Sequence, residues 1–257
     1  MDNTGKWVTA ANYTGGSVAV LPVTENGAVG AAVSIRQHTG RGTDPKRQEK
    51  PHVHSSIFSP DYRYLLVSDL GLDKVMVYKF HKRNGNLELA PVPFFKVKDG
   101  DGPRHLSFHP SGKYVYLLTE MGGNIVACRY HKGKLEEFQT ISSYAANYDG
   151  RRGAADIHVS PDGRFLYTSN RMEANSIGIF SIDPETGKLA SAGFQSTMGK
   201  TPRNFNFDPT GNFLLVANQD SNDIVIFKRD KKTGLLTDTG KRIEVSRPVC
   251  IKWISYP

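Results

Sequence analysis

The stretch RHLSFHPSGKYVYLLTE (residues 104–120) decides the fold, because the chain repeats its pattern. Two runs rich in β-branched and aromatic residues flank a His-Pro-Ser-Gly turn, which is typical of two antiparallel strands joined by a tight turn. Three further hairpins have this pattern: HSSIFSPDYRYLLVSD (54–69), ADIHVSPDGRFLYTSN (155–170) and RNFNFDPTGNFLLVAN (203–218). The turn prolines lie 48 to 51 residues apart, at Pro60, Pro110, Pro161 and Pro209. A fifth copy, MDNTGKWVTAAN (1–12), opens the chain without a first strand.

Each hairpin is followed by two further predicted strands. The third strands are DKVMVYKF (73–80), NIVACRY (124–130), NSIGIFSI (175–182) and NDIVIFK (222–228), and a turn leads from each to a fourth. Four short antiparallel strands repeated at this period are typical of propeller blades. We therefore predict an all-β propeller, a single domain over residues 1–257, with about five blade units of which the opening one is incomplete. RPVCIKWI (247–254) is expected to form a lone first strand.

The composition is that of a globular protein without a membrane span. Of the 257 residues 38% are hydrophobic and 23% are charged, and the formal net charge is +8. No apolar run approaches the ~20 residues that cross a bilayer, and the N-terminus does not have the pattern of a signal peptide. Two cysteines are too few for a disulfide framework and have no metal-ligand spacing. These features favour the cytoplasm, no membrane partner and no metal.

The positive charge favours small anionic substrates over nucleic acid. The basic clusters DPKRQEK (44–50), HKRNG (81–85) and KRDKKTG (228–234) are short and lie beside turn residues, so each is interpreted as a solvated loop. No zinc-finger, helix-turn-helix or RNP pattern is present, and we expect no nucleic-acid partner. A net positive field still steers small anions toward the protein.

Two positions of the repeat predict a site. In a propeller blade the first strand lines the central channel, so its start and the end of the second strand lie at one mouth, opposite the Pro-containing turns. Six residues before the turn proline the chain carries His54, Arg104, Ala155 and Arg203. Long cations at a channel mouth need anionic partners from the protein or a ligand, so we predict an anion-binding mouth.

Ten residues after the proline the chain carries Leu70, Glu120, Arg171 and Gln219, with Tyr13 at the matching place in the opening unit. Glu120 shares its blade with Arg104 and could act as a base or only neutralise the arginines; spacing leaves both open. His52 has the parity of His54, and Asp156 lies next to the charged positions. We therefore take His52, Asp156 and Tyr13 as candidate substrate-binding residues.

These segments also resemble a known family. NYTGGSVAVLPV (12–23), PHVHSSIFSPD (51–61), DGPRHLSFHPSGKYVYLLTE (101–120), AADIHVSPDGRFLY (154–167) and TPRNFNFDPTGNFLLVAN (201–218) resemble the lactonase family of β-propellers. That family includes propeller-type 6-phosphogluconolactonases and fungal carboxymuconate lactonising enzymes. The resemblance implies seven blades, of which this chain would match the last five, and a site without metal or cofactor. It implies a catalytic histidine at His54, arginines at Arg104 and Arg203, and an acid at Glu120.

The resemblance implies hydrolysis of a phosphorylated sugar lactone, with 6-phosphogluconolactone converted to 6-phosphogluconate as the leading reaction. Ester hydrolysis needs an activated water, a stabilised oxyanion and, here, a grip on phosphate. Either Glu120 or His54 would activate the water, and Arg104 and Arg203 would bind the phosphate or stabilise the oxyanion. A carboxymuconate-type lactonising isomerase and a non-enzymatic ligand- or protein-binding propeller remain alternatives.

Overall fold

A computed structural model describes residues 1–254, and these form five antiparallel sheets with one short 3₁₀ helix, η1 (Leu70–Leu72). The first sheet has three strands, β1 (Trp7–Asn12), β2 (Ser17–Pro22) and β3 (Ser34–Gln37). The second has four, β4 (Val53–Phe58), β5 (Tyr64–Asp69), β6 (Lys74–His81) and β7 (Asn86–Lys96). The third comprises β8 (Pro103–Phe108), β9 (Tyr114–Thr119), β10 (Asn124–His131) and β11 (Lys134–Ser142). The all-β class predicted from the repeats is confirmed.

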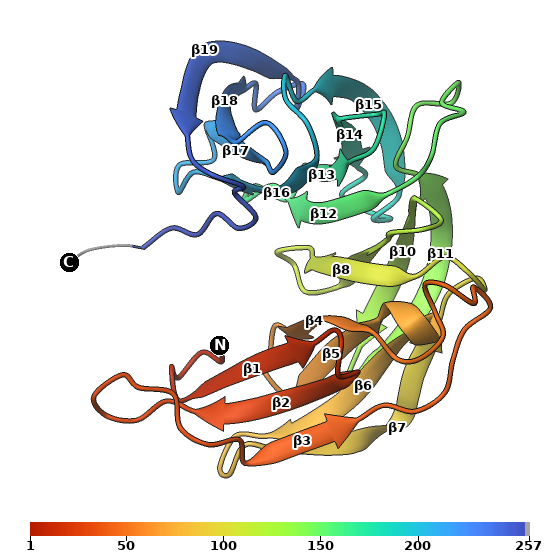
Figure 1. Cartoon of the computed structure of the whole chain (residues 1–257), viewed down its shortest axis with the longest axis vertical. Coiled ribbons are helices and arrows are strands. Elements are labelled where there is room, and N and C mark those ends of the chain that lie inside the picture. Colours follow the sequence, from red (N-terminus) through yellow and green to blue (C-terminus); the bar gives the residue numbers. More distant parts are fainter. Residues whose placement is uncertain (255–257) are drawn as a thin grey trace.

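The last two sheets have the same plan. The fourth sheet comprises β12 (Ala154–Val159), β13 (Phe165–Asn170), β14 (Ser176–Ile182) and β15 (Leu189–Ser196). The fifth comprises β16 (Pro202–Phe207), β17 (Phe213–Asn218), β18 (Asp223–Arg229) and β19 (Leu236–Glu244). In every sheet each strand pairs with the next strand of the chain. The sheets follow one another along an arc, and β8 and β12 lie on its inner side while β7 and β11 lie outside (Figure 1).

The core lies between neighbouring sheets. Between the fourth and fifth sheets, for example, Tyr167 and Ile177 pack with Phe205 and Phe227, and all four are fully buried. Fully burying one such side chain stabilises the fold by about 1.5–3 kcal/mol. Because the middle strands of a sheet are covered on both faces, β13 and β17 are buried along almost their whole length and not at alternate residues.

Tyrosine hydroxyls join successive sheets at the turns between third and fourth strands. Tyr116 Oη donates to the Gly187 carbonyl at 2.8 Å, and Tyr167 Oη donates to the Gly234 carbonyl at 2.6 Å. Both glycines have positive φ, 72° and 77°, a backbone conformation that other residues adopt only with strain. The recurring glycine is therefore a requirement of the turn whose carbonyl accepts the tyrosine hydrogen bond.

The prediction of a first strand over 247–254 is wrong. This segment contains no strand. Hydrogen bonds from asparagine side chains hold it, and backbone pairing with a neighbouring strand does not. Asn204 Oδ1 accepts from the Ile251 amide at 2.7 Å, and Asn206 Nδ2 donates to the Ile251 carbonyl at 3.0 Å. The segment therefore crosses the side chains of β16 and does not pair with its backbone. Within residues 1–254, no helix is long and apolar enough to span a membrane.

Candidate functional site at the inner edge of the sheets

A hollow of about 510 Å³ lies where first strands begin and second strands end. Its lining residues lie in, or directly after, strands of all five sheets and in one loop: Tyr13, Arg47, His54, Glu120, Arg171, Met172 and Arg203. The antiparallel register explains this gathering, because the first residue of each inner strand pairs with the end of the next strand, as Pro103 does with Thr119 and Pro202 with Asn218. The structure thus brings together four of the seven residues singled out from the sequence: Tyr13, His54, Glu120 and Arg203.

A β-bulge recurs at the position six residues before the turn proline. The register shifts between Val53 and Ser55, between Pro103 and His105, and between Pro202 and Asn204. His54, Arg104 and Arg203 are therefore extra residues with no partner across the ladder. In β12 the shift covers Ala155 and Asp156. Bulges re-aim a side chain and are frequent beside active sites, so the repeat position found in the sequence marks a built feature of each sheet.

Glu120 is held by three arginines. Its Oε1 lies 2.6 Å from Arg47 Nη2, and its Oε2 lies 2.9 Å from Arg104 Nε and 3.2 Å from Arg171 Nη2. Burial alone would raise the pKa of Glu120, but Arg171, Arg104 and Arg47 lower it to about 2. Glu120 is consequently ionised throughout the physiological range and is a weak proton acceptor.

Arg104 lies behind this carboxylate and does not line the hollow. Its side chain is 2% exposed, and it donates from Nε to Glu120 and from Nη1 to the Ala155 carbonyl. Burial lowers the pKa of Arg104 to about 10, against the attraction of Glu120, so the guanidinium stays charged at neutral pH. A side chain enclosed in this way orients its neighbours and contributes positive charge from behind the hollow.

Arg203 differs from the other arginines of the hollow. Arg47 and Arg171 pair with Glu120, whereas Arg203 makes no ion pair or side-chain hydrogen bond with any residue of 1–254. It lines the hollow and is partly exposed. A guanidinium presents a fork of N–H donors that matches phosphate and carboxylate oxygens. Arg203 is therefore the arginine with its donors available to an anion.

His54 is a neutral histidine with an unused ring nitrogen. Its Nδ1 is buried and has no hydrogen-bond partner in the described part of the chain. Burial lowers the pKa of His54 to about 2, with smaller contributions from Arg104 and His105. The ring meets Tyr13 edge-to-face at 5.5 Å between centroids and His105 at 5.2 Å. The His54 ring is thus held between two aromatic neighbours, and at neutral pH it is unprotonated and able to accept a proton.

His52 supports the wall of the hollow without lining it. Its ring stacks on Tyr13 with centroids 4.5 Å apart and planes 20° apart. His52 Nδ1 lies 3.2 Å from the Tyr13 carbonyl oxygen, and Nε2 lies 3.2 Å from Glu49 Oε1. In this geometry His52 contacts Tyr13 and not the hollow, so the binding role predicted for His52 would act through Tyr13.

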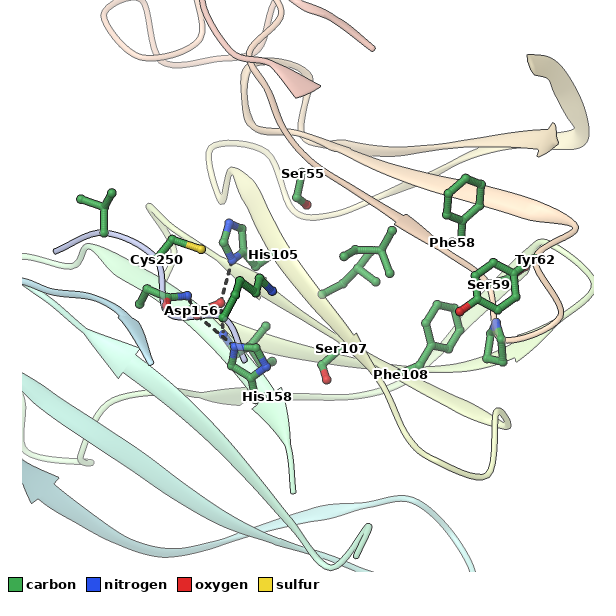
Figure 2. Close-up of a pocket in the computed structure, with 17 residues that line it drawn as sticks. Ser55, Phe58, Ser59, Tyr62, His105, Ser107, Phe108, Asp156, His158 and Cys250 are labelled. Atoms are coloured by element: carbon green, nitrogen blue, oxygen red, sulfur yellow. Dashed lines mark hydrogen bonds and ion pairs between the residues drawn. The ribbon is translucent and has the colours of Figure 1, made fainter. Parts of the chain in front are cut away.

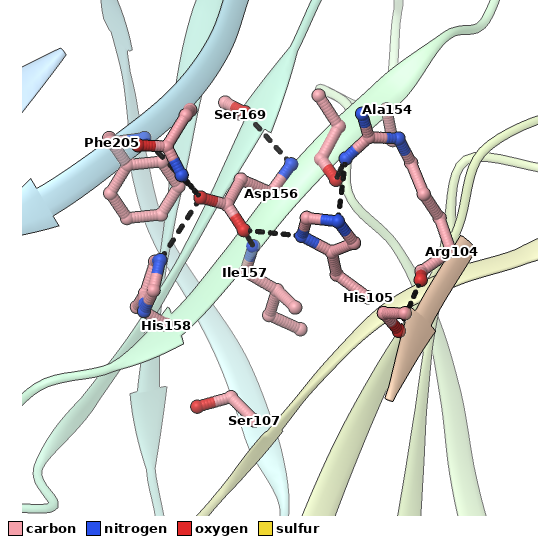
Figure 3. Close-up of polar contacts among 12 residues, drawn as sticks. Arg104, His105, Ser107, Ala154, Asp156, Ile157, His158, Ser169 and Phe205 are labelled. Atoms are coloured by element: carbon pink, nitrogen blue, oxygen red, sulfur yellow. Dashed lines mark hydrogen bonds and ion pairs between the residues drawn. The ribbon is translucent and has the colours of Figure 1, made fainter. Parts of the chain in front are cut away.

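Asp156 does not reach the hollow either. It lines a second hollow of about 500 Å³, with His105 and His158 beside it and Phe58, Tyr62 and Phe108 at the far end (Figure 2). The Asp156 oxygens accept from His105 Nδ1 at 2.7 Å, from His158 Nε2 at 3.0 Å and from the Asn204 side chain (Figure 3). Because the backbone amides of Ile157 and Phe205 also donate to it, this buried carboxylate has little acceptor capacity left for a substrate.

Sequence reasoning missed Arg47, Met172 and the role of Arg171. Arg171 occupies the same repeat position as Glu120, so the signal was present, but a second arginine for one carboxylate could not be inferred from spacing. Arg47 lies in the irregular loop between β3 and β4, where no repeat gives it an equivalent. No group of three or more His, Cys, Asp or Glu in residues 1–254 is arranged to hold a metal ion.

Fold and site together define a propeller-type all-β protein with clustered arginines at one edge of its inner strands. The chain belongs to the lactonase family, described as a seven-bladed β-propeller, whose model matches residues 1–253. It is 38% identical over 260 residues to a 6-phosphogluconolactonase of Bacillus subtilis, covering 99% of this chain and 72% of the relative. It is 40% identical over 258 residues to a 6-phosphogluconolactonase of Formosa agariphila, covering 100% of this chain and 73% of the relative.

The solved structures agree with this assignment. The periplasmic gluconolactonase of Pseudomonas aeruginosa superimposes with a TM-score of 0.94 at 36% identity, covering 100% of this chain and 72% of that chain. The family is described as seven-bladed, whereas residues 1–254 of this chain form five sheets.

Proposed function

We propose that this protein hydrolyses a phosphorylated sugar lactone, with 6-phosphogluconolactone as the substrate and 6-phosphogluconate as the product. The observation that carries the proposal concerns two side chains of one hollow: within residues 1–254 the Arg203 guanidinium has no ion-pair or hydrogen-bond partner, and Nδ1 of neutral His54 has none either. An anion-binding group and a proton acceptor are the two functions that hydrolysis of an anionic ester requires. The names of the two relatives at 38% and 40% identity support this reaction.

In the proposed reaction Arg203 binds the phosphate and His54 acts as the general base. His54 removes a proton from a water molecule as the water oxygen bonds to the lactone carbonyl carbon. The carbonyl oxygen becomes an oxyanion, which the positive charge of Arg47 and Arg171 stabilises. When the intermediate collapses, the bond between the carbonyl carbon and the ring oxygen breaks, and the His54 imidazolium returns the proton to that oxygen. The product is the open-chain acid.

The geometry favours His54 over Glu120 as the base. Glu120 already accepts hydrogen bonds from three arginines, and its pKa is about 2. Its carboxylate therefore has little tendency to take a proton from water. In the protein without substrate the pKa of His54 is also about 2. A bound phosphate would add negative charge beside the ring and raise the pKa of His54 in the complex. Glu120 instead holds the arginines in place and limits their mutual repulsion.

The test is a substrate panel with the purified chain. We expect release of 6-phosphogluconate from 6-phosphogluconolactone faster than spontaneous hydrolysis, and a His54→Gln variant should lose this acceleration by on the order of 100-fold or more. His131→Gln, at an exposed strand end, is the matched control and should match the parent. Turnover of a carboxymuconate but of no lactone would support the isomerase instead, and binding of 6-phosphogluconate without turnover of either would support a binding protein.

Two finer points belong to the same proposal. The phosphate distinguishes this substrate from that of the Pseudomonas aeruginosa neighbour, which is named a gluconolactonase, so the panel includes unphosphorylated gluconolactone. A cytoplasmic location is proposed from the sequence, and that neighbour is named periplasmic. Fractionation of cells that express the natural gene tests the location.

A further inference from the structure

His105 lies between the buried carboxylate of Asp156 and the guanidinium of Arg104 (Figure 3). Its Nδ1 is 2.7 Å from Asp156 Oδ1, and its Nε2 is 3.3 Å from Arg104 Nη1. An ionised carboxylate can only accept a hydrogen bond, and a guanidinium can only donate one. Both contacts are satisfied together only when His105 is neutral, with its proton on Nδ1 and a lone pair on Nε2.

The charge states around the ring agree with this assignment. Burial would raise the pKa of Asp156, but His158 and His105 hold it well below its ordinary value. Burial and the nearby Arg104 charge lower the pKa of His105. A neutral ring beside an ionised carboxylate is thus the expected state at neutral pH, and Asp156 selects which ring nitrogen carries the proton.

The contacts of Arg104 continue this chain into the hollow. Arg104 Nη1 has two acceptors, His105 Nε2 and the Ala155 carbonyl, while Nε donates to Glu120. The His105 ring also meets the His54 ring at 5.2 Å, with 69° between their planes. One side chain therefore touches both the arginine that orients Glu120 and the proposed base.

We propose that Asp156 and His105 are a positioning pair for the site: Asp156 fixes the tautomer of His105, and His105 holds Arg104 and His54 in their working orientation. The proposal rests on the lactone hydrolysis proposed above. Asp156 thereby acts at a distance from the substrate. His158 provides a natural comparison, because it binds the other oxygen of the same carboxylate, meets Phe205 edge-to-face and is not among the residues that line the hollow.

Three substitutions separate positioning from general support of the fold. His105→Asn keeps a group that can reach Asp156 but removes the acceptor for Arg104, whereas His105→Gln can place an amide oxygen near the Nε2 position. We expect His105→Asn to lower kcat by about 10- to 100-fold, in the range seen for lost orienting partners, with KM changed less than about 3-fold. His105→Gln should recover most of kcat, and His158→Gln should match the parent. Equal losses in all three variants, at equal melting temperatures, would overturn the pair.

A second readout does not depend on activity. In protein labelled with ¹⁵N-histidine, the shifts of His105 should show a protonated Nδ1 and an unprotonated Nε2, and Asp156→Asn should change this pattern. A parent chain with this tautomer but no lactone turnover would contradict the proposed function and leave the pair of contacts standing. An active parent whose His105 carries its proton on Nε2 would refute the positioning pair alone.

Discussion

Arg104 Nε lies 2.9 Å from Glu120 Oε2, although the two residues are 16 positions apart in the chain and on opposite sides of a turn. The contact follows from the hairpin, because the start of β8 pairs with the end of β9 and the bulge at Arg104 releases its side chain from the ladder. Arg47 and Arg171 then reach the same carboxylate from a loop and from the end of β13. Glu120 is the anion on which three positive side chains converge.

Replacing Glu120 by Gln should destabilise the fold strongly, since it leaves three guanidinium groups beside one another without their anion. Removing one partner from a buried charge pair typically costs about 3–5 kcal/mol. Urea unfolding at pH 7 measures the change. Glu173→Gln is the matched control, because Glu173 pairs with Arg151 at 2.8 Å on the surface, and exposed pairs contribute about 0–1 kcal/mol. Equal free energies of unfolding for the two variants would contradict the structural role of Glu120.

Stability should also depend on the protonation of His54. Its folded-state pKa is about 2 against 6.5 for the free side chain, so the unfolded chain binds the proton more readily. The contribution of neutral His54 to the free energy of unfolding is therefore complete above pH 6.5 and is lost as the pH falls from there toward 2. The slope is at most about 1.4 kcal/mol per pH unit.

Urea unfolding of the parent and of His54→Gln at pH 7, 6 and 5 tests this. The variant should lack the His54 part of the slope, so the difference in free energy between the two proteins should shift by about 1 kcal/mol or more per pH unit below 6. Parallel curves for parent and variant would mean that His54 titrates near its ordinary pKa.

Much of the fold and half of the site could be predicted from the sequence, for a physical reason. The hairpins repeat because every sheet must bury both faces of its middle strands, so residues at equal distances from the turn proline occupy equivalent places. This relation brought His54, Arg203 and Glu120 to one hollow. It says nothing of Arg47, which lies outside the repeat, or of residues 247–254, where side-chain amides of β16 replace strand pairing.

The repeat could not predict the roles of Arg104 and Asp156, for a different reason. Spacing indicates that a charged side chain starts an inner strand but not which neighbours use up its hydrogen bonds. Arg104 is buried with its Nε on Glu120 and its Nη1 on the Ala155 carbonyl, and Asp156 is buried between two histidines, so neither side chain lines the hollow. Only the packed structure separates these residues from Arg203, which carries the same charge at the same repeat position as Arg104.

Replacing Arg203 by Met should weaken recognition of the phosphate. A charge-assisted hydrogen bond contributes about 1.5–3 kcal/mol, so KM for 6-phosphogluconolactone should rise by about 10- to 100-fold. For unphosphorylated gluconolactone KM should change little, because the lost partner is the phosphate. Arg83→Met, at an exposed turn, is the control for net charge. A loss of equal size for both lactones would assign Arg203 to the oxyanion.

Gly71 links the fold to the position of His54. A Cβ at residue 71 would lie 2.0 Å from the Lys50 carbonyl oxygen and 2.8 Å from the His52 amide nitrogen, both backbone atoms. The Gly71→Ala variant must therefore push away residues 50–52, which lead directly into β4 and His54. We expect a loss of about 1–3 kcal/mol, a fall of several degrees in Tm, and a lower kcat because His54 moves relative to Arg203. The control is Gly15→Ala, where the nearest atom, Asn12 Cβ, would be 3.7 Å away, an ordinary contact. A Gly71→Ala protein with the Tm and the kcat of Gly15→Ala would show that this close approach has no bearing on the site.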